Sequence, residues 1–299
     1  NIYGSLLTNT ADFNVVIAPG FNDPDNNYEV LNAKGVSQLK DLLASGTDLS
    51  KKDVIVDLNG ETMDSNIALN AHSVAVENGT VDASQLSAKA EEGVTLRNVK
   101  LAGSFPKASS NARVIVETAG DVVVDGLDYT GATDGYNPLE INLRNVVSKN
   151  ITVKNCKFAN FTNNSMSVFG MAEGGVLNIE NNTFDLAKTS EAVRISNKTN
   201  TKFTINVKDC SYTYPSDATG QWVGFFLFED YTSTAAEVNT AMQFKNLTIN
   251  VDNVTFDGAK VTELNLFSGA RNQFACMCYD NLQGLIVTDA THFPTFTFK

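Results

Sequence analysis

Histidine, tryptophan and cysteine are scarce in this chain: its 299 residues include two His, one Trp and four Cys. His72 and His292 lie far apart in the sequence, which argues against a Ser-His-Asp triad and against a histidine-based metal site. Zinc ligands at suitable spacing are also lacking. We therefore expect no metal and no cofactor.

Basic charge is in short supply as well. Lys and Arg number 22 against 34 Asp and Glu, so the formal net charge is −12. Nucleic acid and anionic membranes both bind to positive surfaces, so neither is expected as a partner. No apolar stretch approaches the length of a membrane span.

Helical patterns are nearly absent. After residue 50 no segment of useful length repeats its apolar residues at the i, i+3, i+4 spacing of an amphipathic helix. The one good stripe is GVSQLKDLLASG, whose Val and Leu residues share one face. It predicts a helix over Val36–Ser45, with Ser37 as an early capping residue and Gly46 as its stop.

One short phrase, by contrast, occurs seven times: an apolar residue, a charged residue, then Asn, Gly or Asp, two further residues, and a large apolar residue. The copies stand at Val76–Val81, Leu96–Leu101, Val124–Tyr129, Val153–Phe158, Ile179–Phe184, Val207–Tyr212 and Val251–Phe256. Their first residues are 20, 28, 29, 26, 28 and 44 positions apart. Such a period is typical of stacked units that are each too thin to bury an apolar face alone.

A second apolar run with period-two alternation precedes most copies. The runs stand at Ala112–Glu117, Leu139–Leu143, Met166–Phe169, Glu191–Ser196 and Trp222–Phe228. Val, Ile, Phe and Thr fill these runs, as is typical of strands. Since no crossover helix separates the units, we expect an all-β fold in which each strand pairs in parallel with its counterpart in the next unit, about 4.8 Å away. That arrangement is a parallel β-helix, or solenoid.

Two columns of side chains follow from this stacking. The third residue of the phrase is expected at a sharp corner, where Asn and Gly tolerate left-handed φ. The corner column would contain Asn155, Asn181, Asp209 and Asn253. The large residue that closes the phrase is expected to stack inward. That inner column would contain Tyr129, Phe158, Phe184, Tyr212 and Phe256.

The repeat divides the chain into three parts. Residues 1–30 carry no copy and are expected to form an N-terminal arm. Residues 31–256 are expected to form the coil, with the predicted helix over 36–45 capping its first turn, DVIVDLNG. The period breaks after residue 256, so residues 257–299 are expected to form a C-terminal cap or an assembly region.

The four cysteines do not form the pattern of a disulfide framework. Cys156 and Cys210 hold the same position of the phrase two units apart, or about 9–10 Å at the strand spacing, which a disulfide cannot bridge. Cys276 and Cys278 alternate along an expected strand. We expect four buried thiols and synthesis in a reducing cytoplasm.

A capping helix followed by Asn-cornered coils resembles the right-handed parallel β-helix of the pectate-lyase-like superfold, over roughly residues 30–260. This superfold hosts lyases, hydrolases, adhesins and viral fibres, so the resemblance implies a fold rather than an activity. The stretches SEAVRISNKTNTKFTINVKDCSYTY, WVGFFLFEDYTS, FACMCYDN and HFPTFTFK are similar to β-helix virion proteins of tailed phages that infect Bacteroidetes-type hosts. That resemblance implies a virion protein without catalytic activity.

The sequence contains few candidates for catalysis. Hydrolases of the superfold carry N-T-D, D-D, G-H-G and R-I-K motifs, of which the chain has neither D-D nor G-H-G and only Arg194 and Ile195 of the last. Basic and acidic residues do recur in or near the alternating runs, at Arg113, Arg144, Arg194, Glu117, Glu140 and Glu191. They form either a shallow groove or a solvated face of alternating charges. Glu229 and Asp230 could pair as acids or bind calcium, or simply begin a solvated loop. We predict no catalytic residue.

Five aromatic residues crowd into ten positions: Trp222, Phe225, Phe226, Phe228 and Tyr231. Strand alternation sends only some of them inward, and the others would form an exposed apolar patch of the kind that marks a partner. Core packing is the alternative. We predict an interface here, with carbohydrate stacking on Trp222 as a lesser possibility.

Two functions are compatible with these features. The first is a non-enzymatic structural virion protein, a capsid-decorating or fibre-like β-helix that is made in the host cytoplasm and forms a homo-oligomer or contacts other virion proteins. The second is a secreted or surface-located β-helix that acts on carbohydrate, as a polysaccharide lyase, a glycoside hydrolase or a glycan-binding adhesin. Acidic charge, reduced cysteines and non-repeating ends favour the first function, and the Glu/Arg series favours the second.

Overall fold

The computed structural model describes residues 27–105, 112–133, 135–230, 242–280 and 285–299. In this part of the chain the elements are β-strands apart from one α-helix and one short 3-10 helix, Ala290–His292. Strands pair in parallel with two exceptions, which are β20 (Thr255–Phe256) with β21 (Ala259–Lys260) and β22 (Ala275–Asp280) with β23 (Leu285–Ile286). The chain is therefore all-β, and its long parallel sheet is compatible with a β-helix. The described helices are too short or too polar to span a bilayer.

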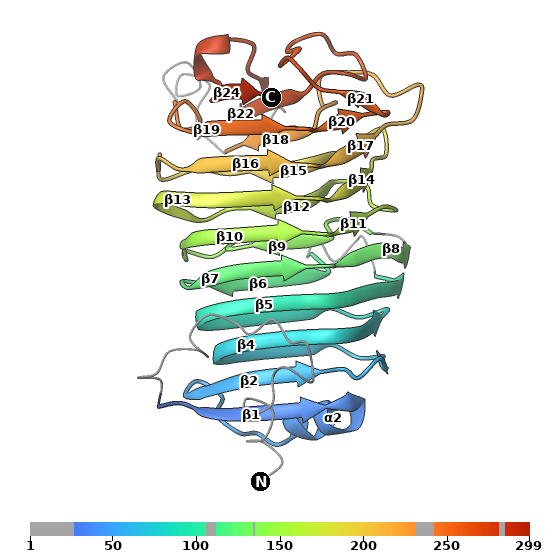
Figure 1. The fold of residues 1–299 in the computed structure, drawn as a ribbon, viewed down its shortest axis with the longest axis vertical. Helices are drawn as coiled ribbons and strands as arrows, with labels where there is room; N and C mark the ends of the chain where they lie inside the picture. Colours follow the sequence, from blue (N-terminus) through green and yellow to red (C-terminus); the bar gives the residue numbers. More distant parts are fainter. Residues whose placement is uncertain (1–26, 106–111, 134, 231–241, 281–284) are drawn as a thin grey trace.

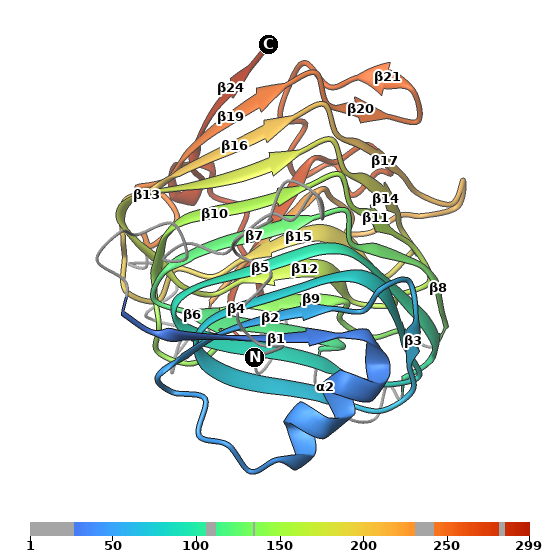
Figure 2. The same ribbon diagram turned by 60° about the horizontal axis from the view of Figure 1, so that its bottom comes forward.

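Each unit contributes up to three strands, which pair with those of the next unit to form three ladders, A, B and C in chain order (Figures 1 and 2). Ladder A contains the first parts of β4 (Ile67–Asp82) and β5 (Leu86–Ser104), then β6 (Val114–Thr118), β9 (Leu139–Ile141), β12 (Asn164–Val168), β15 (Glu191–Ile195), β18 (Phe226–Glu229) and β22 (Ala275–Asp280).

Ladder B contains β1 (Glu29–Lys34), β2 (Lys52–Asp57), the later parts of β4 and β5, then β7 (Asp121–Asp125), β10 (Ser148–Lys154), β13 (Met171–Glu180), β16 (Thr204–Lys208), β19 (Thr248–Asp252) and β24 (Thr295–Phe298). Ladder C contains β3 (Thr62–Met63), the ends of β4 and β5, then β8 (Asp128–Thr133), β11 (Lys157–Phe158), β14 (Thr183–Asp185), β17 (Ser211–Thr213) and β20 (Thr255–Phe256).

The first residues of the seven phrase copies are consecutive partners in ladder B, as the repeat predicts. The partners, in order, are Val76, Leu96, Val124, Val153, Ile179, Val207 and Val251. All seven side chains are buried. The apolar first position therefore marks the inner face of every rung.

The predicted corner column is also confirmed. At Asn155, Asn181, Asp209 and Asn253 the backbone is left-handed, with φ between 52° and 57°. The side chains bond along the column: the Asn181 amide donates to Asn155 Oδ1 at 2.8 Å, and the Asn253 amide donates to Asp209 Oδ1 at 2.7 Å. Asn thus serves both the turn and the contact between units.

The closing residues of the phrase stack inward in ladder C. Phe158, Phe184 and Tyr212 are register partners and are buried, as is Tyr129 one unit earlier. The rings of Phe158 and Phe184 stack with centroids 5.4 Å apart. Phe256 differs because it is only half-buried, in the last rung of ladder C.

Helix α2 (Gly35–Ala44) lies across the first rungs, at the blue end of Figures 1 and 2, and buries Leu39 and Leu42. The predicted stop is confirmed, since Gly46 has a φ of 67°. The predicted capping residue is wrong: the helix begins at Gly35, before Ser37, and its cap residue Lys34 makes no side-chain capping bond.

The four cysteines are free and buried, as predicted. Asn182 lies between the slots of Cys156 and Cys210. Its side chain accepts from the Cys156 N–H at 2.8 Å and donates to the Val153 carbonyl at 2.9 Å, so an amide rather than a sulfur fills this position.

The ladders extend beyond the predicted coil of residues 31–256. β22 pairs with β18 and β24 pairs with β19, so residues of the predicted C-terminal cap add rungs to ladders A and B. At the other end β1 begins at Glu29, inside the predicted arm. Residues 1–26 of that arm lie outside the described residues.

Candidate functional site

The outer face of ladder A carries a column of three polar side chains followed by a leucine. Inward-facing neighbours such as Leu139, Met166 and Val193 are buried, so the residues that follow them point outward. Those outward residues, paired rung by rung, are Glu140, Ser167, Arg194 and Leu227. Three steps of about 4.8 Å make the column roughly 14 Å long.

A groove with a volume of about 530 Å³ lies over part of this column. Glu140 and Arg194 of the column line it together with Glu229. Amides dominate the rest of its polar lining: Asn137, Asn142, Asn145, Asn163 and Asn164. Aromatic and aliphatic side chains line it too: Tyr136, Leu143, Val147 and Phe169. The groove thus combines hydrogen-bonding groups with apolar surface, as ligand sites commonly do.

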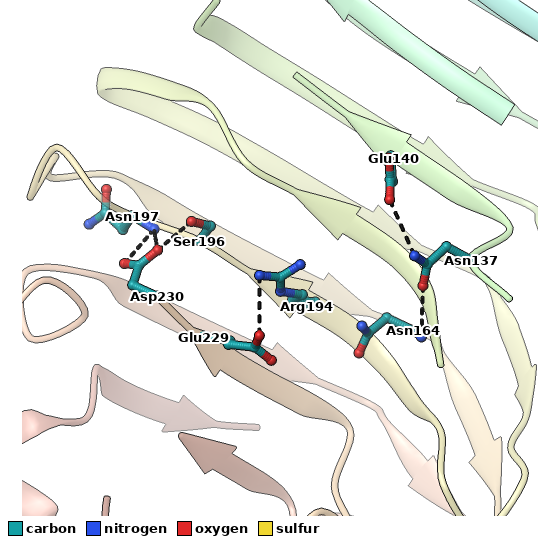
Figure 3. Close-up of polar contacts among 8 residues, drawn as sticks. All are labelled: Asn137, Glu140, Asn164, Arg194, Ser196, Asn197, Glu229 and Asp230. Carbon is teal, nitrogen blue, oxygen red and sulfur yellow. Dashed lines mark hydrogen bonds and ion pairs between the residues drawn. The ribbon is translucent and has the colours of Figure 1, made fainter. Parts of the chain in front are cut away.

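Arg194 occupies the middle of the groove. Its guanidinium lies 3.4 Å from Glu229 Oε1 (Figure 3). It also lies over the Phe169 ring, 4.8 Å from the centroid. Strand β15 supplies Arg194 and the next rung, β18, supplies Glu229, so the pair bridges two units. A stacked and paired guanidinium is held in a fixed direction.

Glu140 is held in place by the Asn137 side chain, which in turn binds the backbone of Asn164. Asn137 Nδ2 donates to Glu140 Oε1 at 3.2 Å, and Asn137 Oδ1 accepts from the Asn164 backbone N–H at 3.3 Å (Figure 3). Burial raises the pKa of Glu140, an effect that Arg194 and the Asn137 hydrogen bond partly offset. A carboxyl in this setting can accept from or donate to a ligand hydroxyl.

Asn164 has an unused acceptor. Its side chain is buried and lines the groove, yet its Oδ1 has no hydrogen-bond partner. Buried polar atoms are nearly always paired in native proteins, so an unpaired acceptor at a groove is a place for a donor from outside. Ser167 Oγ, between Glu140 and Arg194 in the column, is likewise buried without a partner.

Asp230 serves the loop beside the groove. It accepts from Ser196 Oγ and, at 3.0 and 3.1 Å, from the Asn197 N–H (Figure 3). Burial raises its pKa to about 6. Glu229 lines the groove whereas Asp230 is buried beside it, so the two do not form the acid pair that the sequence left open. Among the described residues no group of three or more His, Cys, Asp or Glu could hold a metal.

Of the six Glu and Arg residues that the sequence analysis singles out, only two line the groove. Glu140 and Arg194 line the groove, and Glu191 lies next to it in a second cavity. Arg113 is instead a buried structural residue, whose guanidinium donates to the backbone carbonyls of Ser84 and Gly103 at 3.0 Å. Two others lie outside the groove lining: Glu117 is 3.4 Å from Lys89, and Arg144 is exposed.

The aromatic run needs a correction. Phe225, Phe226 and Phe228 are fully buried and contribute nothing to an exposed patch. They pack against aromatic residues from later in the chain, such as Phe274 and Phe296. Those partners come from the extra rungs, which the sequence had assigned to a separate cap. Trp222 is half-buried, and Tyr231 lies outside the described residues.

Asn137 and Asn164 were missed by the sequence reasoning. Both stand two residues before an inward residue of ladder A, at Leu139 and Met166, so an alignment of the units would have placed them in one column.

Compared with known proteins, the chain matches no family model, no curated protein and no solved structure.

Proposed function

We propose that the chain is a right-handed parallel β-helix that binds a neutral polysaccharide along the groove on ladder A. The observation that carries this proposal is a set of outward polar side chains fixed by their neighbours: Asn137 binds Glu140, and Glu229 pairs with Arg194. Beside them, Asn164 Oδ1 has no hydrogen-bond partner. The three parallel ladders and the Asn-cornered units support the β-helix.

Sugar hydroxyls both donate and accept, and the groove offers both roles. Arg194 and Lys198 supply donors, and Glu140 and Glu229 supply acceptors. Tyr136 and Phe169 add apolar surface for the C–H faces of sugar rings. A column that crosses successive rungs suits an extended ligand better than a compact one.

Charge favours a neutral glycan over an acidic one. The Arg194 guanidinium already faces the Glu229 carboxylate, and a second carboxyl, Glu140, lies in the same groove. The whole chain has a net charge of −12. A polyanion would meet repulsion both in the groove and on approach.

Glu140→Gln and Arg194→Ala are expected to weaken polysaccharide binding by about 10- to 100-fold, because each removes a charged hydrogen-bonding group worth about 1.5–3 kcal/mol. Calorimetric titration of the purified chain with soluble β-glucan, mannan, xylan and galactan measures the effect. Lys157→Ala, an exposed change on ladder C, serves as the control and should bind as the wild type does.

Equal affinity of both groove variants and the wild type would contradict the site. Failure of every neutral polysaccharide in the panel to bind would contradict the proposed function. Circular dichroism of each variant separates loss of binding from loss of fold.

A structural role is the second candidate, as the resemblance to virion proteins implies. The observation that favours it is the asymmetry of the two ends. Helix α2 covers the first rungs, whereas no described strand pairs with the outer edge of β24, the last strand of ladder B. Open strand edges pair readily with other chains, so we propose that copies associate through this end.

Association is expected to increase with protein concentration, and Thr295→Lys with Thr297→Lys should prevent it through repulsion at the edge. Sedimentation velocity measures both. Thr183→Lys, exposed on ladder C, is the control. A wild-type chain that stays monomeric at every concentration would contradict the assembly role without affecting glycan binding.

A further inference from the structure

A second cavity, of about 390 Å³, lies beside the groove and shares Asn163 and Glu229 with it. Trp222, Val223 and Leu227 form its apolar part. Leu227 is the register partner of Arg194 and so continues the outward column by one rung. The groove and this cavity therefore follow one line across the strands.

Trp222 is the aromatic surface of the cavity. The residue after it, Val223, is buried and its backbone N–H donates to the Gly220 carbonyl at 3.3 Å, while Trp222 itself is half-exposed. A half-exposed Trp in a concave site offers a flat apolar face that water solvates poorly. Phe225, Phe226 and Phe228 are fully buried, so they cannot offer an aromatic face to a ligand.

Polar groups surround that face. Glu191, Thr189 and Thr219 line the cavity with Glu229, and Lys188 stands at its rim in an ion pair with Asp217. Glu191 is buried, and burial together with the neighbouring Glu229 raises its pKa, which favours a carboxyl able to donate a hydrogen bond. A cavity that combines an indole with hydroxyl and carboxyl groups suits one side of a pyranose ring.

We infer that this cavity is a second binding position for the same polysaccharide, in which the C–H face of a neutral sugar ring packs on Trp222. The inference rests on the proposed function of the groove, because one glycan chain would pass from the Arg194 rung to the Leu227 rung. Long oligosaccharides reach both positions, whereas short ones fill only one.

The test uses the fact that Trp222 is the only tryptophan in the chain. The full chain is titrated with cello-, manno- and xylo-oligosaccharides of two to six units, while calorimetry and intrinsic fluorescence are both recorded. We expect the six-unit ligand of the bound series to shift or quench the emission. We also expect Trp222→Ala to bind it about tenfold more weakly and Trp222→Phe, which keeps a ring, to lose less.

The outcomes separate the inference from the proposed function. Calorimetric binding with unchanged Trp222 emission, or with wild-type affinity in Trp222→Ala, overturns the second position and leaves the groove intact. Absence of binding for every oligosaccharide and polysaccharide overturns both. The fluorescence of the wild-type chain decides the question even if Trp222→Ala fails to fold.

Discussion

Phe158→Ala is expected to lower the free energy of unfolding by about 3–5 kcal/mol, as truncation of a large core side chain does. Phe158 is buried in ladder C and stacks on Phe184. Its strand β11 pairs with β8 on one side and β14 on the other, so neighbouring rungs are held apart and cannot close over the cavity. Urea denaturation of the variant and the wild type measures the loss.

Lys157→Ala is the matched control, since Lys157 is the exposed neighbour in the same strand. Its effect should stay within about 0.5 kcal/mol. A loss below about 1 kcal/mol for Phe158→Ala would mean that the side chain faces solvent, because a shift of one residue reverses the two faces of a strand.

The second large effect concerns pH. The charged second residues of the seven phrases pair along ladder B and alternate in sign, from Glu77 to Asp252. On its other side, however, Glu77 pairs with a second carboxylate, Asp57 of β2. Burial and Asp57 raise the pKa of Glu77 to about 7 from 4.5, with Arg97 at 3.7 Å a weaker opposing influence. The unfolded chain therefore releases this proton at lower pH than the folded chain does.

The contribution of Glu77 to stability is present below pH 4.5 and is lost as pH rises through 7. The full loss is about 3 kcal/mol, because the interval between the two pKa values corresponds to about 1.36 kcal/mol for each pH unit. Glu77→Gln should flatten the profile of unfolding free energy between pH 5 and 8 and be the more stable form at pH 8.

Urea denaturation across that pH range checks the profile, and Glu91→Gln, an exposed change in the neighbouring unit, is the control. Glu140 and Asp230 have raised pKa values as well, so the wild type and the control should share a falling trend. If the unfolding free energy of Glu77→Gln falls with pH as steeply as that of the wild type, the pKa of Glu77 is not raised in the folded chain.

The ladder register could be predicted because one phrase carries three independent requirements. An apolar residue such as Val153 must face inward, Asn155 must adopt left-handed φ, and Phe158 must fill the core at the end of the phrase. Each unit repeats all three, so an error in one copy would conflict with the others. The cysteine positions followed from the same register.

The end of the coil could not be placed from the repeat because the last units lack it. The ACMCYD strand has alternation but no phrase follows it, and β24 joins ladder B only after β23 and the 3-10 helix Ala290–His292. The repeat therefore predicts no core partner for Phe225 and Phe226, whereas in the structure both rings pack against Phe274.

The candidate site was visible only in part, for a physical reason. Glu140 and Arg194 stand out as charged residues in apolar runs, but Asn137 and Asn164 resemble the many Asn residues that form corners. Arg113 also looked like a surface charge, although its guanidinium is buried among backbone carbonyls. The conformation of the loops decides whether an Asn forms a corner or lines the groove, and whether an Arg is exposed or buried. The repeat does not encode that conformation.

A solved structure of the chain with the best-binding oligosaccharide would decide whether the groove is the glycan site. The ligand is expected over the outward column of ladder A, within hydrogen-bond distance of Glu140 and Arg194 and with a donor on Asn164 Oδ1. Ligand bound on ladder B or C, with the groove empty, would contradict the proposal.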